Sequence, residues 1–285
     1  LIVSNAHLIN HGHMPEINNR SKDFFYTALT DYPEIADTVI GLVTKRLPGY
    51  TGVAPMDIQV LAALKSGVCG VENINKRLQE AINPRVYGKN EITVGNNLFR
   101  VGDKVMQTVN DYELPFVKYG EGAPEEGQGV FNGDIGTVKS IDRANGIVEV
   151  WYDDNRLATY GEADLSDLQL AYAITIHKSQ GSEFDVVVIP LVSGPPTLIN
   201  KNLLYTAITR AKRAVVIVGS KKILAMMVHN NYIAARTTNL CRFLQEEQTK
   251  YLRHFSAEAR NNQSAPQDES DGGMPLDFDA EDLLQ

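Results

Sequence analysis

Two short polar segments in the middle of the chain hold the residues best suited to act on a phosphate. The first is Thr175-Ile-His-Lys-Ser-Gln-Gly-Ser-Glu-Phe184, with a glycine at Gly181. The second is Tyr205-Thr-Ala-Ile-Thr-Arg-Ala-Lys212, which contains Arg210. Arginine offers a planar, permanently charged fork to phosphate oxygens, and glycine allows the backbone to approach a sugar or phosphate closely. The two segments together contain the parts of a phosphate-handling site.

Each segment is expected to join a helix to a buried strand. Apolar side chains at positions 168, 170, 171, 174 and 176 predict a helix that ends near His177, and a second helix is expected from about Asn202 to Lys212. The continuous apolar runs 185–191 and 214–219 are typical of strands buried on both faces of a parallel sheet. A helix between two such strands is the βαβ unit of an α/β domain.

Both segments resemble the late motifs of the superfamily-1 DNA helicases, and the resemblance is greatest to the RecD-like branch. It implies that Arg210 acts as an arginine finger on the γ-phosphate of ATP. It also implies nucleotide contacts from the turn and contacts with single-stranded DNA from the residues before it. The implied nucleotide-binding residues are Gln180, Gly181, Ser182 and Glu183, and the implied DNA-binding residues are Thr175, His177 and Lys178.

Further segments extend the resemblance from residue 1 to about residue 255, in the family's order. They are 5–10, 57–61, 73–79, 102–107 and 131–136, and they add Asn5, His7 and Gln107 to the residues expected to contact DNA. Structural roles remain the alternatives: a helix cap for Gln180, a solvated carboxylate for Glu183, and a loop packed on the β domain for Gln107.

The motifs with which this family holds its nucleotide are not found in the sequence. There is no Gly-x-x-x-x-Gly-Lys-Ser/Thr loop, and the Asp268-Glu269 pair lies in a polar tail rather than after an apolar strand. The chain begins at Leu1 with an apolar run that predicts a strand. We therefore expect the second half of a helicase motor, whose P-loop and magnesium ligands lie in a missing N-terminal half. The complete enzyme would use ATP and Mg²⁺, and this half would be inactive alone.

The pattern changes to short alternating strands between about Phe99 and Asp167. The segments 134–142 and 147–152 flank an Asn145-Gly146 pair typical of a hairpin turn, and 157–160 predicts a third strand. Trp151 is expected in the core of this domain, and the glycine-rich segment 119–133 is expected to be a mobile loop. The resemblance implies a small SH3-like β-barrel inserted at 99–167. The rest, 1–98 plus 168–258, would be an α/β, RecA-like domain with a parallel sheet flanked by helices. Within it we expect a helix from 31 to 47, stopped by Pro48, a strand at 58–64 and a helix at 71–82.

Charge and composition narrow the choice of partners. The formal charge is −8, but residues 261–285 hold seven acidic and no basic side chains, which leaves 28 acidic against 27 basic residues elsewhere. A nearly neutral body indicates a narrow DNA channel with few phosphate contacts. Residues 259–285 are expected to be a disordered acidic tail, with a protein partner as the alternative. Cys69 and Cys241 are expected in the core of a cytoplasmic protein, since they lack the spacing of disulfides or metal ligands. Neither a metal site nor a membrane span is expected.

These features predict a DNA helicase that translocates on single-stranded DNA and unwinds duplex junctions with its own N-terminal motor domain as partner. The 5′–3′ polarity, and a role in DNA repair or recombination, are implied by the resemblance alone. Two alternatives stay open. One is a non-catalytic nucleic-acid or protein interaction module, and the other is an unrelated α/β enzyme, which would need a catalytic cluster of its own.

Overall fold

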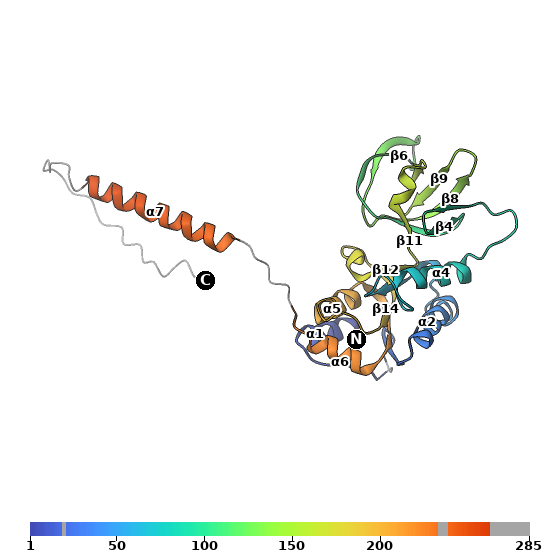
Figure 1. The fold of residues 1–285 in the computed structure, drawn as a ribbon, viewed down its shortest axis with the longest axis horizontal. Helices are drawn as coiled ribbons and strands as arrows, with labels where there is room; N and C mark the ends of the chain where they lie inside the picture. The colour runs from blue at the N-terminus through green and yellow to red at the C-terminus, as the bar shows by residue number, and fades with distance from the viewer. Residues whose placement is uncertain (19–20, 233–238, 263–285) are drawn as a thin grey trace. The chain divides into compact units, whose positions relative to one another are not determined.

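The computed structural model describes residues 1–18, 21–232 and 239–262, with side chains up to residue 252. The chain divides into two units, Leu1–Ile233 and Ala234–Gln285. The first contains a five-stranded parallel sheet and a seven-stranded antiparallel sheet (Figure 1). The second contains one described helix.

The parallel sheet has the strand order β1-β14-β13-β2-β12, and its interior strands are the continuous apolar runs of the sequence. Their bounds are Phe24–Ala28 for β1, Ala211–Gly219 for β14, Phe184–Leu191 for β13, Ile58–Ala62 for β2 and Ala173–Thr175 for β12. Along β13 the side chains alternate between two cores: Val186 and Val188 belong to one, and Val187 and Ile189 to the other. Both faces are therefore covered, as expected of a parallel sheet.

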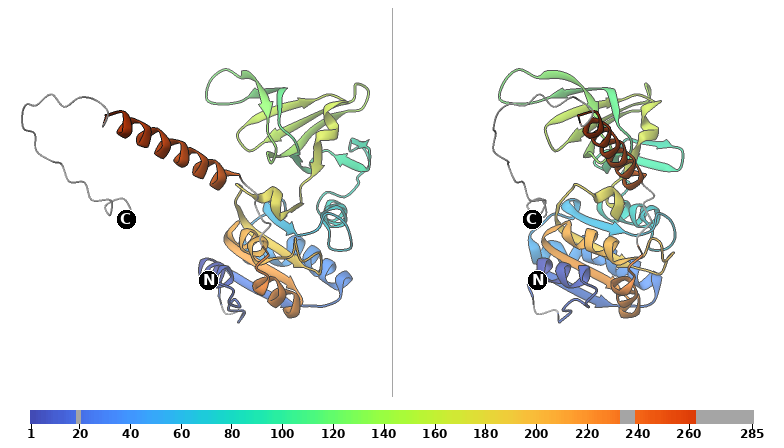
Figure 2. Two further views of the ribbon diagram at one scale, coloured as in Figure 1. Left: turned by 60° about the vertical axis from the view of Figure 1, so that its left-hand side comes forward. Right: turned by 90° about the vertical axis from the view of Figure 1, so that its left-hand side faces the viewer.

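Helices cover the two faces of this sheet (Figure 2). On one side lie α2 (Tyr32–Gly41) and α4 (Val71–Ile82), and on the other α1 (Ile2–Asn10), α5 (Lys201–Thr209) and α6 (Lys221–His229). The predicted helix at 71–82 is confirmed. The predicted stop at Pro48 is wrong, because a π-helical turn (Leu42–Arg46) leads into α3 (Leu47–Thr51). Pro48 stands in the first turn of α3, directly after the π-helical turn, so the helical stretch continues past it.

Two predicted elements differ in type. The apolar start of the chain is helix α1, in which Ile2, Asn5, Ala6 and Ile9 recur at helical spacing and are buried. A three-residue apolar run cannot distinguish a strand from a helix. The helix predicted to end near His177 is also wrong. Its residues form two short strands, β11 (Leu168–Leu170) and β12, followed by the 3-10 turn η4 (Ile176–Ser179). Here the chain crosses from one sheet to the other, and its backbone hydrogen bonds go to distant strands.

The antiparallel sheet has the order β11-β5-β8-β9-β10-β6-β7, and most of its buried residues belong to the same core as α2 and α4. Its bounds are Lys104–Gln107 for β5, Asp111–Lys118 for β6, Glu125–Val130 for β7, Ile135–Asp142 for β8, Ile147–Tyr152 for β9 and Arg156–Tyr160 for β10. A hairpin of β3 (Glu91–Val94) and β4 (Asn97–Arg100) precedes it. The predicted turn at Asn145-Gly146 is confirmed, with φ 65° at Gly146.

Two predictions in this sheet are corrected. Val148, Val150 and Tyr152 of β9 are buried, whereas Trp151 points away from that core and stacks on Tyr119 with ring centroids 5.5 Å apart. The segment 119–133 is not a loop throughout, because it contains β7, which pairs with β6 along most of its length. Glycine supports strand pairing here: the ring of Phe116 lies where a side chain at Gly127 would stand.

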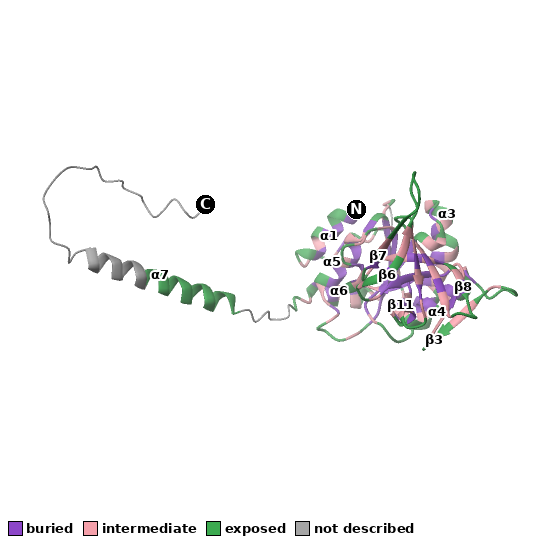
Figure 3. Ribbon diagram, turned by 90° about the horizontal axis from the view of Figure 1, so that it is seen from above, coloured by how far each residue is buried: buried purple, intermediate pink, exposed green. Residues whose placement is uncertain are grey.

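The second unit contains helix α7, Leu240–Asn262, whose described side chains are exposed (Figure 3). Cys241 lies on this helix and is exposed, so the prediction of a core position is wrong for it, whereas Cys69 is buried. Residues 263–285 of the predicted acidic tail lie outside the described residues. In the described parts of the chain, no helix has the length and apolar character to cross a membrane.

Candidate functional site

The two polar segments meet at the amino-terminal edge of the parallel sheet. Phe184 begins β13 and Ala211 begins β14, and these two residues pair with each other. The turn 180–183 and Arg210 immediately precede them. The N–H of Phe184 donates to the carbonyl oxygen of Arg210 at 2.8 Å. The register of two neighbouring strands thus brings together residues that lie some thirty positions apart in the sequence.

Arg210 caps the carboxyl end of α5 and is partly exposed. Its Nη1 donates to the carbonyl oxygen of Ser182 at 3.0 Å, and its Nη2 lies 3.5 Å from Oγ1 of Thr209. Its Nε is buried and has no hydrogen-bond partner among the described residues. A buried donor without an acceptor is unfavourable. An anion that bound beside the guanidinium could therefore accept a hydrogen bond from Nε. The residue is therefore held in place with part of its donor capacity unused.

The turn before β13 presents polar groups to solvent. Gly181 has φ 90°, a conformation that side chains rarely adopt, so glycine is required there. Gln180 is exposed, and Glu183 is exposed with its carboxylate 3.5 Å from Nζ of Lys212. Gln180 follows η4 rather than capping a regular helix, since the predicted helix does not form. The turn has the open backbone and the exposed polar side chains that contact with a ligand would need.

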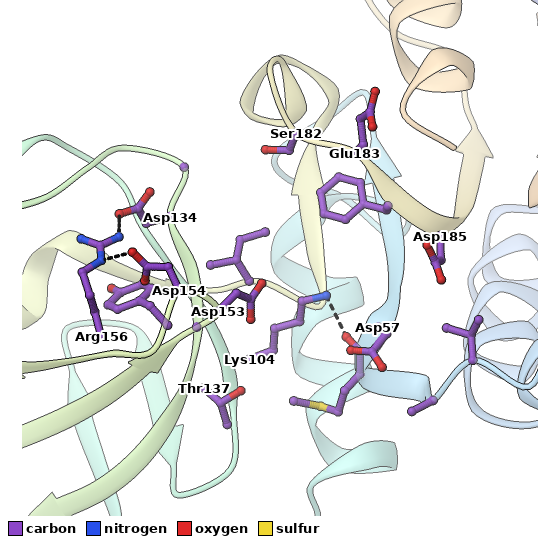
Figure 4. A pocket seen from close by; sticks show the side chains of 18 of the residues that line it. Asp57, Lys104, Asp134, Thr137, Asp153, Asp154, Arg156, Ser182, Glu183 and Asp185 are labelled. Atoms are coloured by element: carbon purple, nitrogen blue, oxygen red, sulfur yellow. Dashed lines mark hydrogen bonds and ion pairs between the residues drawn. The ribbon is translucent and has the colours of Figure 1, made fainter. Parts of the chain in front are cut away.

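A cavity of about 950 Å³ lies between the amino edge of the parallel sheet and the barrel (Figure 4). Ser182 and Glu183 line it, but Arg210 does not. Its walls hold six carboxylates and three cations, and Arg156 is paired with Asp134 and Asp154. The carboxylates are Asp57, Asp134, Asp153, Asp154, Glu183 and Asp185. An excess of negative charge opposes phosphate binding, so this cavity is not where we expect a nucleotide phosphate.

Lys104 crosses from the barrel to the parallel sheet beside this cavity. Its Nζ donates to the carbonyl oxygen of Met56 at 2.7 Å, and the side chain is buried. Burial lowers the pKa of Lys104 to about 8, although Asp57 and Asp153 favour its charged form. One residue earlier, Asp103 accepts hydrogen bonds from Gln79, Asn83, Tyr172 and the N–H of Arg100. Burial raises the pKa of Asp103 despite these four donors.

Sequence reasoning did not single out Asp103 and Lys104, although both lie in a segment that carried the family resemblance. A charged pair at the start of a strand was the only available signal. Their role is clear only in the structure, because Tyr172, Met56 and Gln79 come from distant parts of the chain. These two residues join the barrel to the parallel sheet.

The residues expected to contact DNA fall into two groups. Thr175, His177 and Lys178 lie together at η4, where Oγ1 of Thr175 accepts from the N–H of Lys178. His177 is exposed. Lys178 is partly buried, and burial, with repulsion from Lys65, lowers its pKa.

The second group is not brought to this place as a set. Asn5 is fully buried and bonds to both backbone groups of Glu16. Gln107 is fully buried and accepts from the hydroxyl of Tyr160, so neither side chain is open to a DNA strand in this structure. His7 is exposed on α1. Among the described residues, no group of His, Cys, Asp and Glu side chains is arranged to hold a metal ion.

Comparison with known proteins agrees with both parts of this architecture. Residues 74–152 match the family described as the ATP-dependent RecD-like DNA helicase SH3 domain, and residues 170–218 match the UvrD-like helicase C-terminal domain. The ATP-dependent RecD2 DNA helicase of Deinococcus radiodurans is 31% identical over 212 residues, 74% of this chain and 26% of that protein. The chain is RecD-like.

Another RecD protein and a solved helicase structure are also similar to this RecD-like chain. The RecBCD enzyme subunit RecD of Mycolicibacterium smegmatis is 32% identical over 163 residues, 57% of this chain and 25% of that protein. The chain spans about a quarter of the length of these curated relatives. A Pif1 helicase from Bacteroides, solved with ADP-AlF3 and ssDNA, is 18% identical and covers 87% of this chain and 54% of its own, with a TM-score of 0.44.

The expected fold class is confirmed. The parallel sheet with helices on both faces is RecA-like, and the antiparallel sheet is an SH3-like barrel inserted into it. The barrel sheet extends to β11, which ends at Leu170. The domain limits themselves stay a proposal.

Proposed function

We propose that this chain forms the second motor domain and the barrel of an ATP-dependent DNA helicase that translocates on single-stranded DNA and unwinds duplex junctions. The observation that supports this most is the meeting of Arg210 with the turn 180–183. We also propose 5′–3′ polarity and a cytoplasmic role in DNA repair or recombination, from the resemblance and from the RecD subunits among the relatives.

The position of Arg210 favours action on a nucleotide that another domain holds. Open α/β sheets bind their own ligands outside the carboxyl ends of the strands. Arg210 and the turn lie at the opposite, amino end of β13 and β14. We infer that ATP and Mg²⁺ are held by an N-terminal motor domain, and that closure of the two domains brings Arg210 to the γ-phosphate.

Each residue of the site has a proposed task. Arg210 would exchange the carbonyl oxygen of Ser182 for a phosphate oxygen and stabilise the charge of the transition state. Gly181 would allow the backbone to approach the nucleotide, with Ser182 beside it. Glu183 would leave Lys212 and accept a hydrogen bond from the ribose. Gln180, which is exposed, would contact the γ-phosphate.

The DNA-facing residues proposed from the structure are His177 and Lys178, with Thr175 shaping the turn that carries them. His7 is a further exposed candidate on α1. Asn5 and Gln107 would support the fold rather than touch the strand, because both are fully buried.

Substitution of Arg210 in the complete helicase tests the catalytic proposal. Arg210→Ala should retain nucleotide affinity but lower DNA-stimulated turnover by about 10³-fold or more. Arg210→Lys should restore little, because an ammonium cannot reproduce the guanidinium fork. Arg213→Ala is the matched control, since Arg213 pairs with Asp185 at 3.4 Å and should leave turnover nearly unchanged. Near-normal turnover in the Arg210 variants would mean that this residue has only a structural role, the hydrogen bond to the carbonyl oxygen of Ser182.

Residues 1–285 alone should release phosphate from ATP only at background rate, because the proposed P-loop and magnesium ligands belong to the other motor domain. Phosphate release with and without single-stranded DNA measures this. Strong DNA-stimulated turnover by residues 1–285 would contradict the division of labour between two domains.

A double variant, His177→Ala with Lys178→Ala, tests the DNA contacts. Affinity for single-stranded DNA should fall, and the dependence on salt should become shallower because fewer phosphates are neutralised. Lys221→Ala with His229→Ala makes the same change of residue types at exposed positions of α6 and serves as the control. An unchanged salt dependence in the first pair would remove both residues from the DNA path. DNA binding with no part in ATP turnover would favour the interaction-module alternative.

A further inference from the structure

The hairpin of β6 and β7 leaves one edge of the barrel sheet open. β7 is the last strand in the order of the sheet, and its only strand partner in the described parts of the chain is β6 (Figure 2). Along Glu125–Gln128 no backbone hydrogen bond to any other described segment is found. Alternate N–H and C=O groups of an edge strand point outward, where they can pair with another extended chain.

A shallow hollow accompanies this edge. It is lined by residues of β6, β7 and β10 and has a volume of about 630 Å³. Phe116 and Val117 supply its apolar surface, the ring of Phe116 covers Gly127, and Glu126 also lines the hollow. The aliphatic part of a lysine or arginine could pack on such a surface while its charged end meets the carboxylate.

The charge of the hairpin selects among possible occupants. Residues 109–133 contain five carboxylates and one lysine, a formal charge of −4. The carboxylates are Asp111, Glu113, Glu121, Glu125 and Glu126. Nucleic acid would be repelled by this surface, and so would a second copy of the same hairpin. A basic polypeptide would be attracted.

Aromatic side chains next to the hairpin add contact area. Tyr112 is 68% exposed and Phe131 is 43% exposed, and their rings pack edge to face with centroids 5.7 Å apart. Exposed aromatic side chains held in place by a neighbour are typical anchors of protein interfaces. They lie at the end of the hairpin where Asp111 pairs with Val130.

We propose that the outer edge of β7 is a docking site for an extended basic segment of a partner protein, which adds to the barrel sheet as an extra strand. Backbone hydrogen bonds to β7 would supply affinity, and the carboxylates and the hollow would select lysine and arginine. The surface is separate from Arg210 and from the turn 180–183, so this proposal does not depend on the proposed ATPase role.

The test uses residues 1–285 and a fluorescent peptide of about eight residues that alternates lysine with valine, the length of a typical strand. The peptide should bind, and a lysine–proline peptide of equal charge should bind about tenfold more weakly, because proline cannot donate to a strand. A glutamate–valine peptide should not bind. Hydrogen exchange should slow at residues 125–128 and stay unchanged at the turn 143–146.

Variants separate the hairpin from general electrostatics. Glu125→Gln with Glu126→Gln should weaken binding of the lysine–valine peptide by about tenfold. Glu72→Gln with Glu162→Gln removes two exposed carboxylates elsewhere and should have little effect. Equal binding of the lysine–proline peptide, or exchange protection elsewhere than β7, would overturn strand addition. The hairpin variant should also bind single-stranded DNA more tightly than the control variant does. Equal affinities of the two variants for DNA would contradict the repulsion expected at this surface.

Discussion

The parallel sheet and the barrel bury their strands differently. In β13 every residue from Val186 to Leu191 is buried, and apolar side chains face cores on both sides. In β9 only alternate residues are buried, and the inner face of the barrel includes the hydroxyls of Tyr152 and Tyr160. Where the two parts join, the buried residues include charged ones, Asp103 and Lys104. Apolar burial on both faces therefore stabilises the parallel sheet, whereas the barrel and its junction combine an apolar core with buried polar networks.

The largest effect is expected at the junction. Asp103→Ala would leave four donors without their acceptor. Each buried donor left unpaired costs about 1–3 kcal/mol, so we expect the free energy of unfolding to fall by about 3 kcal/mol or more. Denaturant titration measures it, followed by Trp151 fluorescence, which reports the barrel, and by helical circular dichroism, which reports mainly the helices outside the barrel. If Asp103 couples the two parts, the two transitions should separate. Asp37→Ala, an exposed partner of Arg77, is the control and should cost less than about 1 kcal/mol. A similar loss of free energy of unfolding in both variants would show that Asp103 contributes no more than an exposed ion pair.

The pH dependence of stability tests the buried charge of Lys104 at the same junction. Folding lowers the pKa of Lys104 from 10.5 to about 8. Between these values the unfolded chain binds more protons, so this group makes the free energy of unfolding rise as the pH increases from about 8 towards 10.5. The full change is on the order of 3 kcal/mol.

Lys104→Met should remove that rise, because methionine does not titrate. Denaturant titrations of both proteins at pH 7, 8 and 9.5 give the difference between their slopes. Lys221→Met, at an exposed position, should keep the slope of the unsubstituted protein. Equal slopes for the Lys104→Met and unsubstituted proteins would show that folding does not lower the pKa of Lys104.

A smaller effect is expected inside the barrel. Tyr160→Phe removes the hydroxyl that donates to Gln107 at 2.8 Å and pairs with Tyr152. Gln107 already has a buried Nε2 without a partner among the described residues, so the loss leaves its amide unsatisfied. We expect a cost of about 1–3 kcal/mol. Ile189→Val in the parallel sheet, a change of one methylene, should cost about 1 kcal/mol. A neutral Tyr160→Phe would show that the polar network contributes little to the barrel.

The smallest effect is expected at the surface of the amino edge. Arg213 is about half exposed, pairs with Asp185 and donates to the carbonyl oxygen of Thr51 at 2.9 Å. Exposed ion pairs contribute little, so Arg213→Ala should change the free energy of unfolding by less than about 1 kcal/mol. Thermal unfolding at low and high salt gives the comparison. A loss of several kcal/mol would place an essential contact where we expect a solvated one.

Particular residues show why some of the fold was predictable from the sequence. The strands β13 and β14 are apolar runs bounded by polar turns, and α4 has helical periodicity and ends at Asn83-Pro84. Asn145-Gly146 forces a hairpin because glycine adopts positive φ readily. These are local signals. Residues 168–177 carry an apolar pattern that fits a helix, yet their hydrogen bonds go to β5 and β2, which lie far away in the sequence.

The candidate site divides in the same way. Residue types and their order were enough to identify Arg210 and the turn 180–183, because the chemistry of phosphate contact restricts which residues can supply it. Burial was not predictable for Asn5 and Gln107, since a polar residue can either face a ligand or satisfy a distant backbone group. In the structure, Asn5 forms hydrogen bonds with the backbone of Glu16, and Gln107 accepts one from the hydroxyl of Tyr160.

The sequence by itself determined the fold class, the RecD-like kinship and the residue types of the site, because apolar periodicity and short motifs are local properties of the chain. Only the tertiary structure decided that Arg210 meets Ser182 at the amino edge of the sheet. It alone decided that Asp103 and Lys104 join the barrel to the parallel sheet, and that β7 leaves an edge open. Each of these depends on strand register and on contacts between distant residues, which no local pattern encodes.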